Sequence, residues 1–154
     1  MSFRLVNSGG GVTDPAVVNL AASGVVHPGG VVVFNRVAGL PIAPAASGST
    51  ATAVFGVSLD YAQGASDVSV KVIPFHPGQL WEADCVNAAV TAHVGIRHLL
   101  ENDLLIRNTG TDVTANTGVF LALAMAGSAS GSGRLIGRFI SNIVPVGQNQ
   151  TTFA

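Results

Sequence analysis

Alternation of apolar and polar residues with a period of two is the sequence feature that most constrains how this chain can fold. In the segment 54–59, Phe55, Val57 and Leu59 share one side of an extended backbone. The same alternation recurs in segments 68–73, 81–86, 119–125 and 134–140, and a β-branched run covers 31–34. Successive side chains of a strand point to opposite faces, so these segments are predicted to be half-buried strands. Turn sequences such as Pro77-Gly78 separate them, which predicts an all-β fold, a small antiparallel β-barrel or β-sandwich.

Two segments are less regular. Residues 38–53 are rich in Ala, Pro, Ser, Gly and Thr, which predicts a loop. Residues 92–105 are compatible with a short helix, or with a strand over 95–100, a turn at 101–103 and a second strand through Arg107. We favour the hairpin, because Asn102 and Asp103 are good turn residues.

The chain of 154 residues is long enough for one domain with a real core. Residues 1–20 contain Ser8-Gly9-Gly10-Gly11 and Asp14-Pro15, which interrupt regular structure, so we expect an extended N-terminal arm. Residues 21–147 form the predicted β domain, and the polar residues 148–154 form a C-terminal tail. The tripeptide His-Pro-Gly occurs at 27–29 and again at 76–78, which indicates either convergent turn chemistry or a duplicated fold.

The chain carries very little charge. Only 10% of its residues are charged and 48% are hydrophobic, against about 25% charged in an ordinary soluble domain. The longest apolar run, 119–126, is far shorter than the ~20 residues of a membrane span. We therefore expect no membrane association, and a surface that is covered by other copies of the chain or by a larger assembly. Nucleic-acid binding is not expected either, because the net charge is −1 and Lys71 is the only lysine.

No catalytic, cofactor or metal site is expected. Cys85 is the single cysteine, which excludes an intrachain disulfide, and its predicted strand face, shared with Trp81 and Ala83, is typical of a buried structural residue. His93 and His98 are five residues apart, which places their rings on opposite faces of a strand, or well apart in angle on a helix, and does not match the ligand spacing of zinc sites.

Other polar motifs are predicted to be structural as well. The carboxylate pairs Glu82/Asp84 and Glu101/Asp103 lack the aromatic residues that usually line a sugar cleft, and we expect solvated or interface charges. The glycine-rich stretch 127–134 matches neither a P-loop nor G-x-G-x-x-G, so a hairpin loop is expected.

The order of segments resembles a known family. The strand Gly30-Val31-Val32-Val33-Phe34 precedes an Ala/Pro/Ser/Thr loop, then Phe55-Gly56-Val57-Ser58-Leu59, then a Pro-Gly-x-x-Trp-Glu-Ala strand over 77–83. This pattern over about residues 25–140 is similar to the small head decoration, or cement, proteins of tailed bacteriophages, which are compact β-barrels or sandwiches without catalytic residues.

The resemblance implies a structural virion protein that is made in the host cytoplasm. It would bind the outer surface of the capsid, contact the major capsid protein, form a homo-oligomer and bridge capsid subunits. Other virion components (a head-fibre base, a tail-tube subunit or a minor capsid protein) remain alternatives, and a ligand- or glycan-binding β-barrel is a further one. From its position, the arm is expected to add a strand to a neighbour, with Phe3, Leu5 and Val12 as apolar anchors and Arg4 as a charged clamp.

Overall fold

The computed structural model describes residues 3–7, 17–37, 40–50, 53–63, 69–76, 78–108, 118–127 and 133–141. These residues form strands β1 to β13 and one short 3-10 helix, η1 (Thr91–His93), and they contain no α-helix. The predicted all-β class is therefore confirmed.

The strands form two large sheets and one small sheet, with antiparallel neighbours throughout. The six-stranded sheet has the order β1-β9-β13-β12-β10-β11 and the five-stranded sheet the order β2-β8-β6-β4-β5. The strands of the six-stranded sheet are β1 (Phe3–Asn7), β9 (Leu80–Asp84), β10 (Arg97–Leu100), β11 (Ile106–Arg107), β12 (Phe120–Gly127) and β13 (Arg134–Phe139). Those of the five-stranded sheet are β2 (Val18–Ala21), β4 (Val31–Val37), β5 (Leu40–Pro44), β6 (Val54–Ser58) and β8 (Ser69–Pro74), and the small sheet pairs β3 (Val25–Val26) with β7 (Ala62–Gln63).

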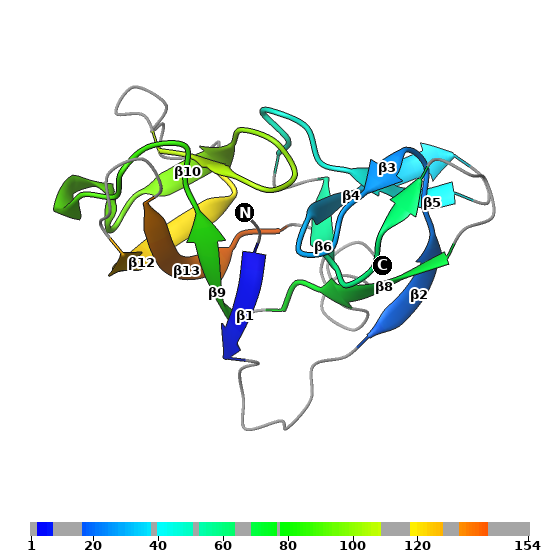
Figure 1. Cartoon of the computed structure of the whole chain (residues 1–154), viewed down its shortest axis with the longest axis horizontal. Coiled ribbons are helices and arrows are strands. Elements are labelled where there is room, and N and C mark those ends of the chain that lie inside the picture. The colour runs from blue at the N-terminus through cyan, green and yellow to red at the C-terminus, as the bar shows by residue number, and fades with distance from the viewer. Residues whose placement is uncertain are drawn as a thin grey trace, which may run out of the picture.

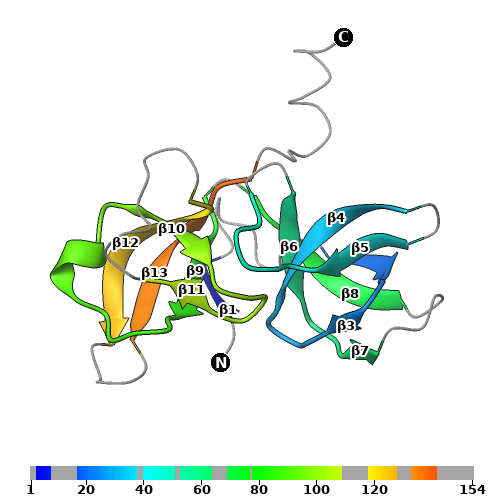
Figure 2. The same cartoon turned by 90° about the horizontal axis from the view of Figure 1, so that it is seen from above.

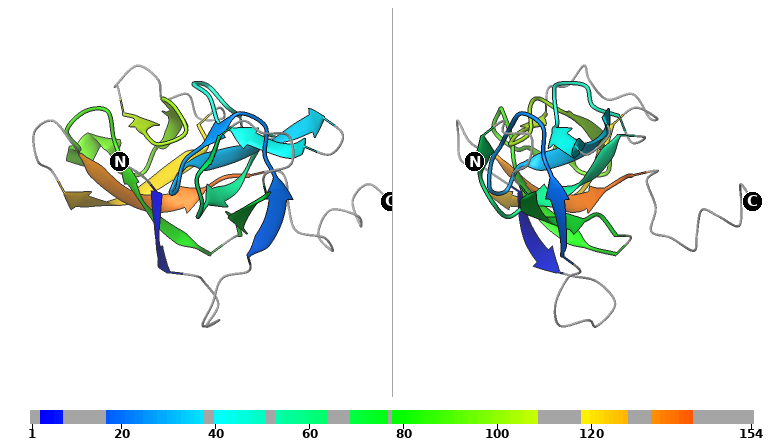
Figure 3. Two further views of the ribbon diagram at one scale, coloured as in Figure 1. Left: turned by 45° about the vertical axis from the view of Figure 1, so that its right-hand side comes forward. Right: turned by 90° about the vertical axis from the view of Figure 1, so that its right-hand side faces the viewer.

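The two large sheets lie side by side along the long axis of the molecule (Figures 1 and 2). Each sheet curls until two of its strands meet at an isolated parallel bridge. In the five-stranded sheet this bridge joins Ala22 to Ile42, and in the six-stranded sheet it joins Cys85 to Ile106. The result is two barrel-like units, a first unit (residues 17–76) and a second unit (residues 78–141), which Figure 3 shows from two further sides.

The two units have the same topology. Numbered in chain order, the strands of the five-stranded sheet in the first unit lie as first, fifth, fourth, second and third, and strands β9 to β13 of the second unit repeat this order. Their registers also correspond: Val18 lies opposite Val72, as Trp81 lies opposite Gly137, and the parallel bridge closes the first strand onto the third in both units. The chain therefore contains the same five-stranded arrangement twice.

The repeated tripeptide does not mark this repetition. His27-Pro28-Gly29 precedes β4, the second strand of its unit, whereas His76 and Gly78 flank the entry to β9, the first strand of the next. The two tripeptides thus occupy non-equivalent turns, and convergent turn chemistry explains them.

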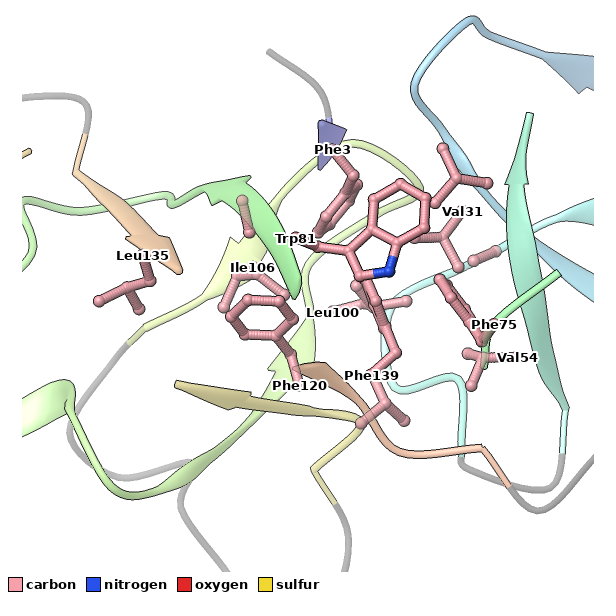
Figure 4. Close-up of a cluster of buried hydrophobic side chains, with 14 of the residues drawn as sticks. Phe3, Val31, Val54, Phe75, Trp81, Leu100, Ile106, Phe120, Leu135 and Phe139 are labelled. Carbon is pink, nitrogen blue, oxygen red and sulfur yellow. The ribbon is translucent and has the colours of Figure 1, made fainter. Parts of the chain in front are cut away.

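One hydrophobic core is shared by the two units. Phe75, which follows β8, stacks on Phe139 of the second unit with ring centroids 4.0 Å apart, and it meets Trp81 edge-on at 5.8 Å. Val31 and Val54 of the first unit belong to the same buried cluster (Figure 4). A second, smaller cluster fills the inside of the first unit, and its members are Ala22, Val26, Val32, Ile42, Ala62, Val70 and Val72. Because the shared core draws side chains from both units, the units are packed against each other and not merely tethered.

Most predicted elements are found, and two need correction. The hairpin interpretation of 92–105 is confirmed, since β10 and β11 pair antiparallel around a turn at 101–105. The loop predicted over 38–53 is wrong in part, because Leu40–Pro44 forms β5. Pro41 and Pro44 are tolerated there because β5 is the last strand of its sheet, where missing N–H donors cost least.

Candidate interaction surface

The N-terminal strand β1 lies in the middle of the molecule and does not project from it as a free arm. It pairs antiparallel with β9, with Phe3 opposite Ala83 and Leu5 opposite Trp81. The Phe3 side chain is 3% exposed and meets Phe139 edge-on at 5.2 Å. The Phe3 N–H also donates to the carbonyl of Gly29 in the first unit at 2.9 Å, so β1 connects both units.

This placement corrects the expected arm over 1–20. Residues 3–7 and 18–20 belong to sheets, and the alternation of Phe3 and Leu5 with Arg4 and Val6 explains why, since it suits a strand with one buried face. Phe3 and Leu5 pack in the protein's own core and are therefore not exposed anchors. Val12 and the tail 148–154 lie outside the described residues.

Arg4 faces outward and forms a charged cluster with β9. Its Nε donates to Glu82 Oε1 at 2.8 Å, and its Nη1 donates to Asp84 Oδ2 at 3.3 Å. Arg134 on β13 reaches the same Glu82 oxygen at 3.3 Å. The hydrogen bond to Asp84, opposed by partial burial and aided by Glu82, raises the pKa of Arg4. The predicted clamp residue is thus already held by two carboxylates of its own chain.

Large apolar side chains remain exposed on this framework. The most exposed are Tyr61 at 55% and Val6 at 52%. The others are Val17, Val25, Phe34, Leu59, Val86, Val90, Leu123 and Met125. In β12, Phe120 and Ala122 are buried while Leu123 and Met125 are exposed, and Gly137 on the neighbouring strand leaves room for the Phe120 ring.

Cys85 is confirmed as a buried residue. It is 3% exposed, and burial followed by the nearby Asp84 raises its pKa to about 12. Such a thiol stays protonated at neutral pH, which is the opposite of what a nucleophile requires.

The histidines His93 and His98 lie closer together than predicted. Their ring centroids are 5.7 Å apart, because η1 turns the chain back before β10 begins. His98 is fully buried, its Nε2 lies 2.8 Å from the His93 carbonyl, and burial lowers its pKa. Within the described ranges, no three His, Cys, Asp or Glu side chains are grouped so that they could hold a metal ion.

The acidic pairs serve different contacts. Glu82 and Asp84 both bind Arg4, whereas the second pair divides: Glu101 Oε2 accepts from Arg107 Nε at 2.7 Å, and Asp103 Oδ2 lies 3.0 Å from His27 Nδ1. The last contact joins the turn before β4 to the β10–β11 turn, so it crosses between the two units. These carboxylates therefore hold strands and units together.

Comparison with models of known protein families finds no match, and comparison with curated proteins finds none either. Within the described part of the chain, no helix is long and apolar enough to cross a membrane.

Proposed function

We propose that this protein is a structural virion component that binds the outer surface of a bacteriophage capsid and stabilises it by bridging capsid subunits. The observation that carries the proposal is the combination of a 10% charged composition with large apolar side chains exposed on a well-packed β framework. Interface cores are depleted in charged residues, and an uncharged surface loses little hydration energy when it is covered.

The fold supports a mechanical role. The shared core, the strand β1 and the His27–Asp103 contact connect the two units at separate points. A bridging protein must keep its contact surfaces at a fixed spacing, and a pair of packed units does so better than two units on a flexible linker. Many copies on a repeating lattice would then add avidity to contacts of ordinary size.

Co-sedimentation with purified, undecorated capsids from the same source tests the proposal. We expect saturable, stoichiometric binding and a higher temperature of capsid disassembly. Three variants that each add a charge at a different exposed site locate the contact: Leu59→Glu, Val90→Glu and Leu123→Glu. A variant whose site lies in the contact should bind less, and the others serve as matched controls. Absence of binding to any capsid form would overturn the proposal, and a saturable thermal shift with sugars would replace it with a ligand-binding role.

A further inference from the structure

The repetition of one strand arrangement in two units exposes a difference between them at one edge. In the second unit, β1 pairs with the outer side of β9, along residues that precede the bridge residue Cys85 in the chain. In the first unit, the equivalent strand is β2, and its bridge residue is Ala22. Among the described residues, no strand pairs with the outer side of β2 ahead of that bridge. Figure 1 shows β1 lying along β9 in one unit, and β2 at the border of the other.

The side chains at this edge are incompletely buried. Trp81 and Ala83, which lie opposite Leu5 and Phe3 of β1, are 1% and 0% exposed. Their equivalents by register are Val18 and Leu20, which pack against the smaller core but remain half-buried. The preceding Val17 is 45% exposed. An added strand would therefore complete the burial that β1 provides in the other unit.

The β2 edge also lacks the features that usually prevent strand pairing. Natural edge strands carry charges or prolines that block association. The other outer strands of the two large sheets have such residues: Arg4 in β1, Arg107 in β11, and Pro41 and Pro44 in β5. The sequence of β2, Val-Asn-Leu-Ala, has none.

We propose that the outer edge of β2 pairs with β2 of a second copy of this chain, forming a two-fold symmetric dimer with a continuous sheet. β1 runs antiparallel to β9, and a two-fold axis perpendicular to the sheet also places β2 antiparallel to its copy. With Asn19 on the axis, Val18 of one copy lies opposite Leu20 of the other. Each apolar position then meets an apolar partner, as Trp81 meets Leu5 in the second unit. The uncharged edge brings no like charges together.

Light scattering on the purified full chain over a range of concentrations tests this inference. We expect a mass of twice 15.5 kDa that falls toward 15.5 kDa on dilution. Asn19→Lys should give a monomer at concentrations where the parent protein is dimeric, because like charges directly opposite each other destabilise a strand pair. Asn19 is exposed but lies opposite Lys71 of its own chain, so Asn19→Lys also brings two like charges together within the monomer and should lower its melting temperature slightly, whereas Asn19→Asp should not. Val25→Lys, which adds the same charge at an exposed position of the short strand β3, is the control and should remain dimeric.

A mixing experiment tests the register itself. Asn19→Asp alone should also be monomeric, but an equimolar mixture of Asn19→Lys and Asn19→Asp should restore a dimer through opposite charges across the axis. A parent protein that is monomeric at all concentrations, a dimer insensitive to both variants, or a mixture that stays monomeric would each overturn the inference. These measurements require no capsid, so their failure is distinguishable from failure of the proposed function.

Discussion

Ala22 and Cys85 occupy the same position in the two units. Each follows the first strand of its unit and forms a parallel bridge to an isoleucine of the third strand. In each case the next residue donates its N–H to that isoleucine's carbonyl: Ser23 to Ile42 at 2.9 Å and Val86 to Ile106 at 3.0 Å. Both residues are small and at most 3% exposed.

This equivalence predicts that Cys85→Ala is mild. Alanine already fills the corresponding position of the first unit, and only the sulfur is removed from the core. We expect a loss of about 1 kcal/mol in the free energy of unfolding, measured by urea denaturation. A loss above about 4 kcal/mol, as for a large cavity, would contradict the proposed equivalence.

The same thiol predicts a dependence of stability on alkaline pH. Burial raises the pKa of Cys85 from 9.0 to about 12, so the folded state keeps a proton that the unfolded state releases. The stability due to the neutral thiol is complete below pH 9.0 and is lost as the pH rises toward 12. The free energy of unfolding, taken from denaturation curves at a series of pH values in this interval, should fall more steeply with pH for the parent protein than for Cys85→Ala. Equal slopes would show that the thiol is not buried in the folded state.

The corrected position of β1 predicts that Phe3 acts through stability. Phe3→Ala removes a ring from the core shared by both units, and we expect a loss of about 3 kcal/mol in the free energy of unfolding. Val6→Ala, on the exposed side of the same strand, should change stability by less than about 0.5 kcal/mol. If Phe3→Ala left stability intact and weakened only capsid binding, the original interpretation of an exposed anchor would be restored.

The Arg4 cluster predicts a small, salt-dependent contribution. Arg4 is 42% exposed at its side chain, so its ion pairs with Glu82 and Asp84 are partly screened by water. We expect Arg4→Met to cost about 0.5–1 kcal/mol at low salt and less at high salt. Arg138→Met is the matched control, because Arg138 is exposed and has no ion pair among the described residues. Equal losses in the two variants would show that the cluster contributes no specific stability.

Strand alternation allowed most of the strands to be predicted from sequence, because each buries one face. It failed for β5, where Pro41 and Pro44 resemble loop residues, since an edge strand needs fewer N–H donors than sequence rules assume. It also failed for 3–7, where the nearby glycines outweighed the alternation of Phe3 and Leu5. The strand pattern was visible there, but its partner β9 lies 73 residues or more along the chain, and local sequence does not specify such a partner.

The repeated topology, and the β2 edge that no described strand covers, could not be predicted for a related reason. Equivalent positions of the two units hold different side chains, such as Val18 and Trp81, or Val32 and His98. The repetition lies in hydrogen-bond register and strand order, and neither is visible as sequence similarity. The tripeptide that suggested a duplication marks turns at non-equivalent positions.

Gly137 lies at a point where the second unit is more tightly packed than the first. Its equivalent by register is Val72, yet a Cβ on Gly137 would lie 2.0 Å from the Leu121 carbonyl oxygen and 2.9 Å from the Phe120 ring. The β12–β13 register shifts just beyond Ala122, and Phe120 fills the interior in place of a side chain at 137. Gly137→Ala should therefore force the backbone apart and lower the free energy of unfolding by about 3 kcal/mol. Ala124→Ser, on the exposed part of β12, should stay within about 0.5 kcal/mol of the parent protein. A neutral Gly137→Ala would mean that β12 and β13 lie farther apart at this point than described.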